Sequence, residues 1–275
     1  MRRFALWLAL LLLAFAILGY AYWTQQRTAS YQLSDLRLHI LTSAQPAPFL
    51  LDLQPRLYSS DYRDLATLHG KLAGLLRQAQ EAQLMSSDNL LVLPEHIASW
   101  LFLQEEKPQL YAAQQLSEAL PLLGLSHPLL WLQGKLQGEQ LPQQLIRHKA
   151  QRLADDYLWL CRQLASEFQV SLLAGSLLLP AAEYRDGRLH TDGRGAWQQV
   201  GLACAADGTL LLPPQQQPWD AHTPPGQLQA QMLRQLGHTA AISLEQASLP
   251  WPLPGSQHSN SRPAVSQLQA HPLQP

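Results

Sequence analysis

The strongest constraint on the fold is an alternation between short apolar runs and amphipathic stretches from residue 36 to residue 212. Residues 36–41 alternate apolar and polar side chains, as a strand does, whereas residues 62–85 carry apolar side chains at helical spacing. Residues 90–93 are a short apolar run that suits a strand buried on both faces, and residues 170–179 predict a longer, strongly apolar strand that holds Ala174-Gly175-Ser176. This order predicts an α/β domain in which helices pack on a layered sheet.

The remaining elements are expected from spacing and turn chemistry. The longest helix is expected at 143–169, where apolar side chains form one stripe, and Ser60 or Asp61 is expected to cap the helix at 62–85. A strand at 200–205 is followed by Asp207-Gly208, a hairpin turn signal. Loops are expected at 43–58, which holds three prolines, and after the helical pieces near 97–102 and 110–120.

The composition changes after residue 212. Residues 213–275 hold 11 of the 20 prolines and 12 glutamines, with no lysine. We expect a Pro/Gln-rich, partly disordered tail with one short helix at 228–236 and disorder over 250–275. The change also suggests the hypothesis that the reading frame, or the selection on it, altered near residue 212. A +1 or −1 coding frame that restored a lysine and a cysteine-containing strand would confirm this hypothesis, and an unbroken frame without them would contradict it.

The first 23 residues predict a membrane anchor. Two arginines precede an apolar run at 4–23, which is about 20 residues long and matches a bilayer core of roughly 30 Å. Aromatic residues stand at its far end, as expected at a headgroup layer. A cleaved signal peptide is the alternative, although its apolar core is usually shorter and no clean small-x-small cleavage site precedes Thr24. Residues 24–35 are polar and are expected to form a short linker. Because two arginines precede the run and only Arg27 follows closely, the positive-inside rule predicts the main domain on the non-cytoplasmic side.

Charge and cysteine content exclude several classes of protein. The formal net charge of −1 gives no basic face for nucleic acid. Two cysteines, Cys161 and Cys204, are too few for a disulfide scaffold, and the ten histidines show no spacing typical of metal ligands. We therefore expect no metal and no cofactor. The oligomeric state stays open, and a homo-oligomer is one alternative.

One motif carries the candidate chemistry. Leu91-Val92-Leu93-Pro94-Glu95-His96 is a buried strand that ends in Pro-Glu, and residues 160–178 join a helix to an Ala-Gly-Ser strand. In this order and spacing, residues 36–212 resemble the carbon–nitrogen hydrolases of the nitrilase superfamily. The resemblance implies a sheet-and-helix sandwich of the nitrilase type, a hydrolase of non-peptide C–N bonds, a small amide or nitrile as substrate, and Glu95 as the catalytic general base.

The family's other catalytic residues have no counterpart. Its reaction needs a cysteine nucleophile and a lysine that stabilises negative charge, both after the Asp-Gly hairpin. No lysine follows Lys149 and no cysteine follows Cys204. We therefore also expect the sandwich to be incomplete, with an exposed sheet edge.

Three functions follow from this pattern. The chain is a hydrolase of this family, or a non-catalytic or truncated member that acts as a binding subunit or has no activity, or a relative of the lipoprotein N-acyltransferases. Cys204 is either a core thiol or a substitute nucleophile. His96 either lines the same pocket as Glu95 or lies in a surface loop.

Overall fold

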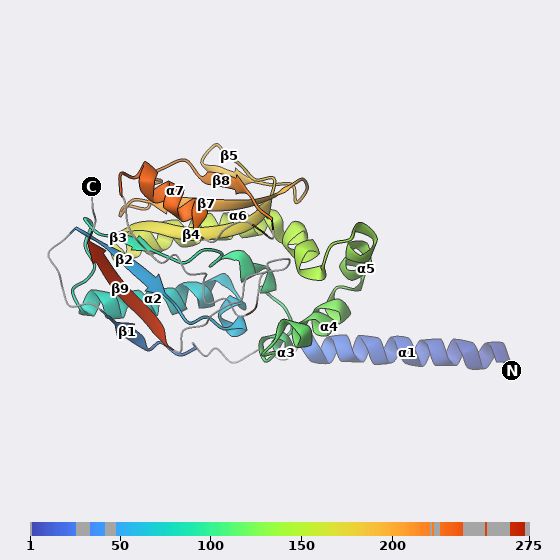
Figure 1. The fold of residues 1–275 in the computed structure, drawn as a ribbon. Coiled ribbons are helices and arrows are strands. Elements are labelled where there is room, and N and C mark those ends of the chain that lie inside the picture. Colours follow the sequence, from blue (N-terminus) through green and yellow to red (C-terminus); the bar gives the residue numbers. More distant parts are fainter. Residues whose placement is uncertain are drawn as a thin grey trace.

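The computed structural model describes residues 2–25, 34–41, 48–220, 222, 226–238, 251 and 265–272. Their main feature is a mixed sheet of seven strands in the order β1-β9-β2-β3-β4-β7-β8, and β5 and β6 form a separate two-stranded hairpin (Figure 1). The strands are β1 (Leu38–Ile40), β2 (Phe49–Gln54), β3 (Leu90–Val92), β4 (Ser171–Pro180), β5 (Glu183–Arg185), β6 (Arg188–His190), β7 (Trp197–Cys204), β8 (Gln215–Pro218) and β9 (Ser266–Pro272).

The centre of the sheet is parallel, antiparallel pairs lie on both sides of it, and the edge strand β1 pairs parallel with β9. β2, β3 and β4 run parallel to one another, while β9 pairs with β2, β7 with β4 and β8 with β7 in antiparallel registers. The helices are α1 (Arg2–Gln25), α2 (Leu65–Glu81), α3 (Pro108–Tyr111), α4 (Leu116–Ser126), α5 (Pro128–Gln137), α6 (Leu141–Phe168) and α7 (Gln227–Gln235), with 3₁₀ turns η1 (Ser59–Tyr62) and η2 (Ser99–Leu103). The predicted α/β class is confirmed.

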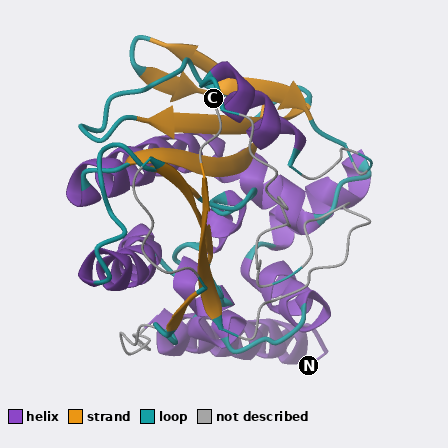
Figure 2. Ribbon diagram, turned by 60° about the vertical axis from the view of Figure 1, so that its left-hand side comes forward, coloured by secondary structure: helices purple, strands orange, loops and turns teal. Residues whose placement is uncertain are grey.

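The two faces of the sheet are covered by different helices. Alternate strand residues belong to two separate hydrophobic clusters: Leu91 and Leu172 pack with α2 and α6, whereas Val92 and Leu173 pack with α7. The alternation follows from the two-residue period of a strand. Figure 2 shows the sheet as a continuous twisted layer flanked by helices. The larger core therefore lies on the α2/α6 face, and α7 covers the opposite face.

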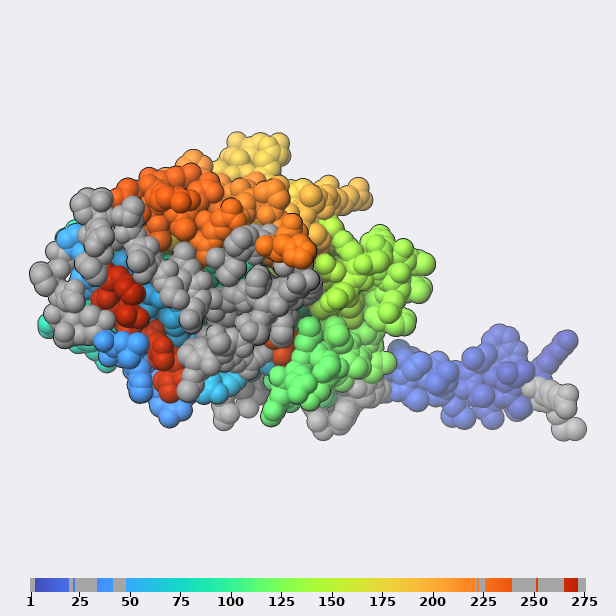
Figure 3. Space-filling model, in the orientation of Figure 1, coloured from blue at the N-terminus to red at the C-terminus, as the bar shows by residue number. Residues whose placement is uncertain are grey.

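The predicted membrane anchor at 4–23 is wrong. α1 spans Arg2–Gln25 and projects from the body as an arm (Figure 3). Within the part of the chain that the structure describes, however, no helix combines the length and the apolar character that crossing a bilayer requires. The single-pass membrane location, and the placement of the main domain on the non-cytoplasmic side, are corrected with it.

Several elements confirm the sequence analysis, with adjusted ends. β3, β4, α6 and α7 lie where apolar runs and helical stripes predicted them. The cap of α2 differs: Asp64 caps it, because its extended backbone lets the carboxylate accept the N–H of Thr67 at 2.6 Å. Ser60 and Asp61 instead belong to the 3₁₀ turn η1.

Two segments predicted as loops are regular structure. β2 lies inside 43–58 between Pro48 and Pro55, which sit just outside its ends and so do not interrupt its hydrogen bonds. α4 and α5 occupy 116–137, where Pro128 starts α5 and Gly138, with φ of 72°, ends it. Proline at a helix start and glycine at its end are typical helix boundaries.

The predicted disorder over 250–275 is wrong for Ser266–Pro272, which form β9, and two strands of the sheet, β8 and β9, come from residues after 212. β9 lies between β1 and β2 and pairs with β2 across six residues of each strand, and β8 extends the other edge. Trp251 is buried and packs edge-to-face on Trp100, with ring centroids 5.3 Å apart. Residues after 212 therefore supply part of the folded domain.

Candidate functional site

The candidate site begins in the turn that follows β3. The N–H of Leu93 still donates to the Leu173 carbonyl at 2.9 Å, and the chain then leaves the sheet through Pro94 and Glu95. His96 has a φ of 60°, a left-handed conformation that non-glycine residues rarely adopt. Its backbone N–H donates to the Ser176 hydroxyl at 2.9 Å, which fixes the turn to β4.

Gly175 explains why the turn can approach β4 so closely. The register between β4 and β7 shifts between Leu173 and Ser176, which is a bulge, and Gly175 has a φ of 68°. A Cβ atom at this position would overlap the carbonyl oxygen of Pro94. The Ala-Gly-Ser sequence therefore serves two purposes: the glycine admits the Pro94 carbonyl, and the serine binds the next turn residue.

The Glu95 side chain is buried, with 2 % of its surface exposed. Its Oε2 accepts the backbone N–H of Gly226 at 2.8 Å, while its Oε1 has no hydrogen-bond partner among the described residues. Burial raises the pKa of the Glu95 carboxyl, and the Gly226 amide, the Gln199 side chain and the Gln229 backbone act in the opposite direction.

The first residues of helix α7 contact both the Glu95 carboxylate and the end of β3. Gly226 caps its start with a φ of 78°, and the Gln229 side chain donates to the carbonyl of Leu93. Met232 packs so closely on β7 that a Cβ at Gly201 would lie 2.6 Å from its sulfur. The start of α7 therefore occupies the space beside the Glu95 carboxylate.

A chain of buried and half-buried amide and hydroxyl groups continues from the turn. Gln199 on β7 donates to the Ser176 hydroxyl at 2.9 Å and accepts the side-chain amide of Gln217 on β8 at 2.7 Å. Buried polar groups need such partners, because leaving one unpaired costs about 1–3 kcal/mol. These contacts hold β4, β7 and β8 in register around the turn.

No described lysine or cysteine contacts the Glu95 carboxylate, whose hydrogen bond comes from Gly226. Lys149 donates instead to the carbonyls of Phe102 and Gln104 and to Glu106, all within 2.9 Å. Lys71 donates to the carbonyl of Asp35. The cationic group that the resemblance requires is therefore absent from the described surroundings of Glu95.

Both cysteines are buried free thiols in the core on the α2/α6 face. Burial raises the pKa of Cys204 to about 12 and raises that of Cys161 well above its usual value. Ser176 pairs with Gly201, so Cys204 lies three residues further along β7, about 10 Å from that pair. A thiol that holds its proton, on the face opposite α7, is poorly suited to act with Glu95.

His96 does not lie in an exposed loop. It is 6 % exposed, and its Nδ1 lies 3.4 Å from the Ser99 hydroxyl. Burial lowers the pKa of the His96 ring to about 4, so the ring is neutral at pH 7. The Ser99 hydroxyl also accepts the N–H of Leu178 at 3.1 Å. The ring therefore supports the turn beside β4.

Sequence analysis singled out Glu95 and His96 and placed Ser176 in a strand without giving it a role in the site. It missed four further residues, namely Gln199, Gln217, Gly226 and Gln229. Gly226, Gln229 and Gln217 lie in the segment set aside as a tail, and the one signal there was a glycine directly before a predicted helix. No protein family of known description matches the chain, and no curated protein matches it.

Proposed function

We propose that this chain is a carbon–nitrogen hydrolase-like protein without hydrolase activity, in which Glu95 binds the start of α7 rather than a substrate. The observation that supports this proposal is the 2.8 Å hydrogen bond from the Gly226 N–H to a Glu95 carboxylate that is 2 % exposed. A carboxylate at the first turn of a helix interacts favourably with its unpaired N–H groups.

The chemistry of the described neighbours supports the same proposal. Amide or nitrile hydrolysis through an acyl-enzyme needs a nucleophile and a group that stabilises negative charge, besides the base. Around Glu95 the structure describes glutamine side chains, a serine hydroxyl and backbone amides, and Cys204 faces the other side of the sheet. A base without these two groups cannot open the C–N bond by that route.

An active hydrolase is the second candidate, and one observation favours it. Burial raises the pKa of Glu95, which is the direction that brings a carboxyl closer to neutral pH for general-base catalysis. Under this alternative α7 has to leave the Glu95 carboxylate before a substrate can bind. The substrate would be a small amide or nitrile.

Ammonia release separates the two candidates. The full chain and its Glu95→Gln variant are incubated with simple amides and nitriles, beside an active amidase as positive control. We expect no release above buffer from either form. Release by the unchanged chain that falls about 100-fold or more in Glu95→Gln would refute the proposal and support the hydrolase.

Thiol labelling gives an independent check. Cys204→Ala and Cys161→Ala variants are each treated with a thiol-specific reagent at pH 8, in buffer and in denaturant. We expect the remaining thiol to react at least 100-fold more slowly in buffer, because burial keeps it protonated and covered. Fast labelling of Cys204 in the folded protein would indicate a nucleophile and favour the hydrolase.

A further inference from the structure

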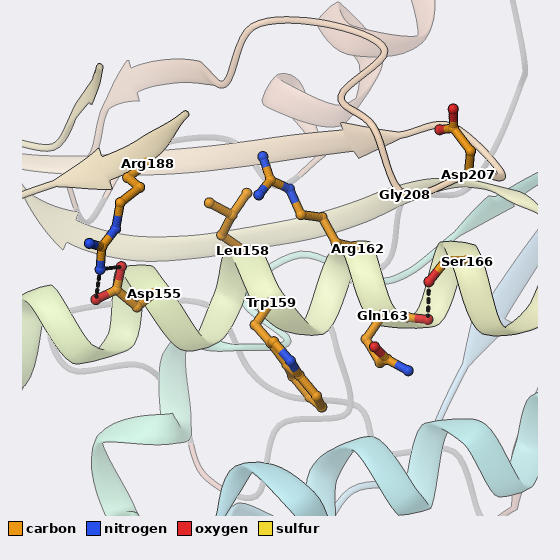
Figure 4. A pocket seen from close by; sticks show the side chains of 9 residues that line it. All are labelled: Asp155, Leu158, Trp159, Arg162, Gln163, Ser166, Arg188, Asp207 and Gly208. Atoms are coloured by element: carbon orange, nitrogen blue, oxygen red, sulfur yellow. Dashed lines mark hydrogen bonds and ion pairs between the residues drawn. The ribbon is translucent and has the colours of Figure 1, made fainter. Parts of the chain in front are cut away.

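A groove on the outer side of α6 contains a charged side chain that the proposed function does not use. It has a volume of about 380 Å³ and is lined by residues of α6, by Arg188 on β6 and by the turn at Asp207 and Gly208 (Figure 4). In Figure 4 the guanidinium of Arg162 lies between the Arg188–Asp155 ion pair and that turn.

Arg162 has few partners for its charge. Its one described hydrogen bond runs from Nη2 to the Gly187 carbonyl at 3.4 Å, which is long, and its Nε has no partner among the described residues. Among those residues it also forms no ion pair within 4.0 Å. Because a guanidinium stays charged at all accessible pH values, this positive charge is available to an anion.

The two carboxylates beside the groove are already engaged. Asp155 accepts Arg188 Nη2 through both oxygens at 3.1 Å. Asp207 accepts the N–H and the hydroxyl of Thr209 at 2.8 and 2.6 Å, and Figure 4 shows its carboxylate directed away from Arg162. Neither carboxylate therefore neutralises Arg162 directly.

The turn that forms one wall of the groove packs closely on α6. Gly208 has a φ of 83°, and a Cβ there would lie 3.1 Å from the carbonyl oxygen of Arg162. Within the turn, the Gly208 N–H donates to the Ala205 carbonyl at 2.8 Å. Leu158, which is 5 % exposed, lies beside Arg162 on the same side of α6 (Figure 4). These contacts fix the turn beside the Arg162 guanidinium.

We propose that this groove binds the anionic group of a small molecule, a carboxylate or a phosphate, through the guanidinium of Arg162. Guanidinium groups bind both anions in a bidentate manner. The site lies on the α6 face, away from the Glu95 carboxylate and α7, and it is independent of the proposed function.

The test follows the side-chain Nε–H signal of Arg162 by NMR in the full chain, titrated with inorganic phosphate or with acetate. Sodium chloride at matched ionic strength is the control. We expect a saturable shift with at least one of the two anions, and the anion that gives it identifies the chemistry. Shifts no larger than those in chloride, for both anions, would overturn the proposal.

Variants test whether anion binding depends on Arg162. Arg162→Gln should weaken the affinity at least 10-fold by calorimetry, whereas the exposed Arg185→Gln on β5 should leave it unchanged within 2-fold. Asp207→Asn should strengthen binding at least 2-fold, because it removes a negative charge near Arg162. The variant keeps a side-chain oxygen that can accept the hydrogen bonds from the Thr209 N–H and hydroxyl. If Arg162→Gln fails to fold, Asp207→Asn decides: an unchanged or weaker affinity contradicts the proposal.

Discussion

The carboxylate of Glu95 accepts the backbone N–H of Gly226 at 2.8 Å, although 131 residues separate the two in the chain. The contact joins the turn after β3 to the start of α7, which packs across β7 and β8. One carboxylate therefore links the parallel centre of the sheet to a helix from the glutamine-rich segment. Its protonation should be linked to the stability of the whole domain.

Glu95→Gln should make the protein more stable at high pH. Because the pKa of Glu95 is raised in the folded state, folding favours the protonated carboxyl. The stability that the protonated Glu95 carboxyl contributes is fully present below the pKa of the unfolded chain. It is lost as the pH rises through the pKa of the folded state. Urea unfolding from pH 4 to pH 9 should show the variant gaining stability relative to the unchanged chain as the pH rises, with the largest gain at the alkaline end.

The matched control for that series is Glu81→Gln on α2, which removes an exposed carboxylate instead. It should leave the pH dependence unchanged. A Glu95→Gln curve that runs parallel to that of the unchanged chain at every pH would mean that folding does not alter the protonation of Glu95.

His96 should produce the opposite pH dependence. Its folded pKa is lowered to about 4 from 6.5, so the unfolded chain binds a proton that the folded one does not. The stability it contributes is present above pH 6.5 and is lost as the pH falls toward 4, by up to about 3 kcal/mol. His96→Asn keeps a residue type that tolerates positive φ, and it should flatten this acid limb in urea unfolding. If the variant loses as much stability at acid pH as the unchanged chain, a group other than His96 takes up the proton.

Gly175→Ala should destabilise the domain by roughly 3 kcal/mol or more, because the new Cβ would overlap the Pro94 carbonyl and φ is positive. Gly138→Ala is the matched control: its φ of 72° is similar, but nothing lies within 4 Å of the added atom. It should cost about 1 kcal/mol. Thermal unfolding measures both, and equal losses would show that close approach at Gly175 adds nothing to the backbone strain.

The parts of the fold that the sequence predicts are those that local patterns determine. α6 follows from one apolar stripe, and β3 and β4 follow from apolar runs. β2 was missed because prolines at 48 and 55 look like loop residues, although they only flank the strand. α5 was missed for a similar reason, since Pro128 and Gly138 mark its two ends rather than a loop.

The candidate site is less predictable, because its partners are distant in sequence. Pro94-Glu95 after an apolar run marks the turn, but nothing local to Glu95 indicates that Gly226 will bind it. Hydrogen bonds between residues so far apart depend on how the strands are ordered in the sheet. That order places β8 beside β7, and α7 packs on both strands, so the contact depends on a segment that composition alone assigns to a Pro/Gln-rich tail.

Leu268→Ala should test whether β9 is part of the cooperative fold. Its side chain is 1 % exposed and packs in the core on the α2/α6 face, opposite Leu53 of β2. Truncation should lower the free energy of unfolding by about 2–4 kcal/mol, because it removes buried methyl groups and leaves a cavity. Gln269→Ala, next to it on the exposed side of the strand, should change stability by less than about 0.5 kcal/mol. Urea unfolding of the full chain measures both, and two equally small effects would mean that the segment does not pack in the sheet in solution.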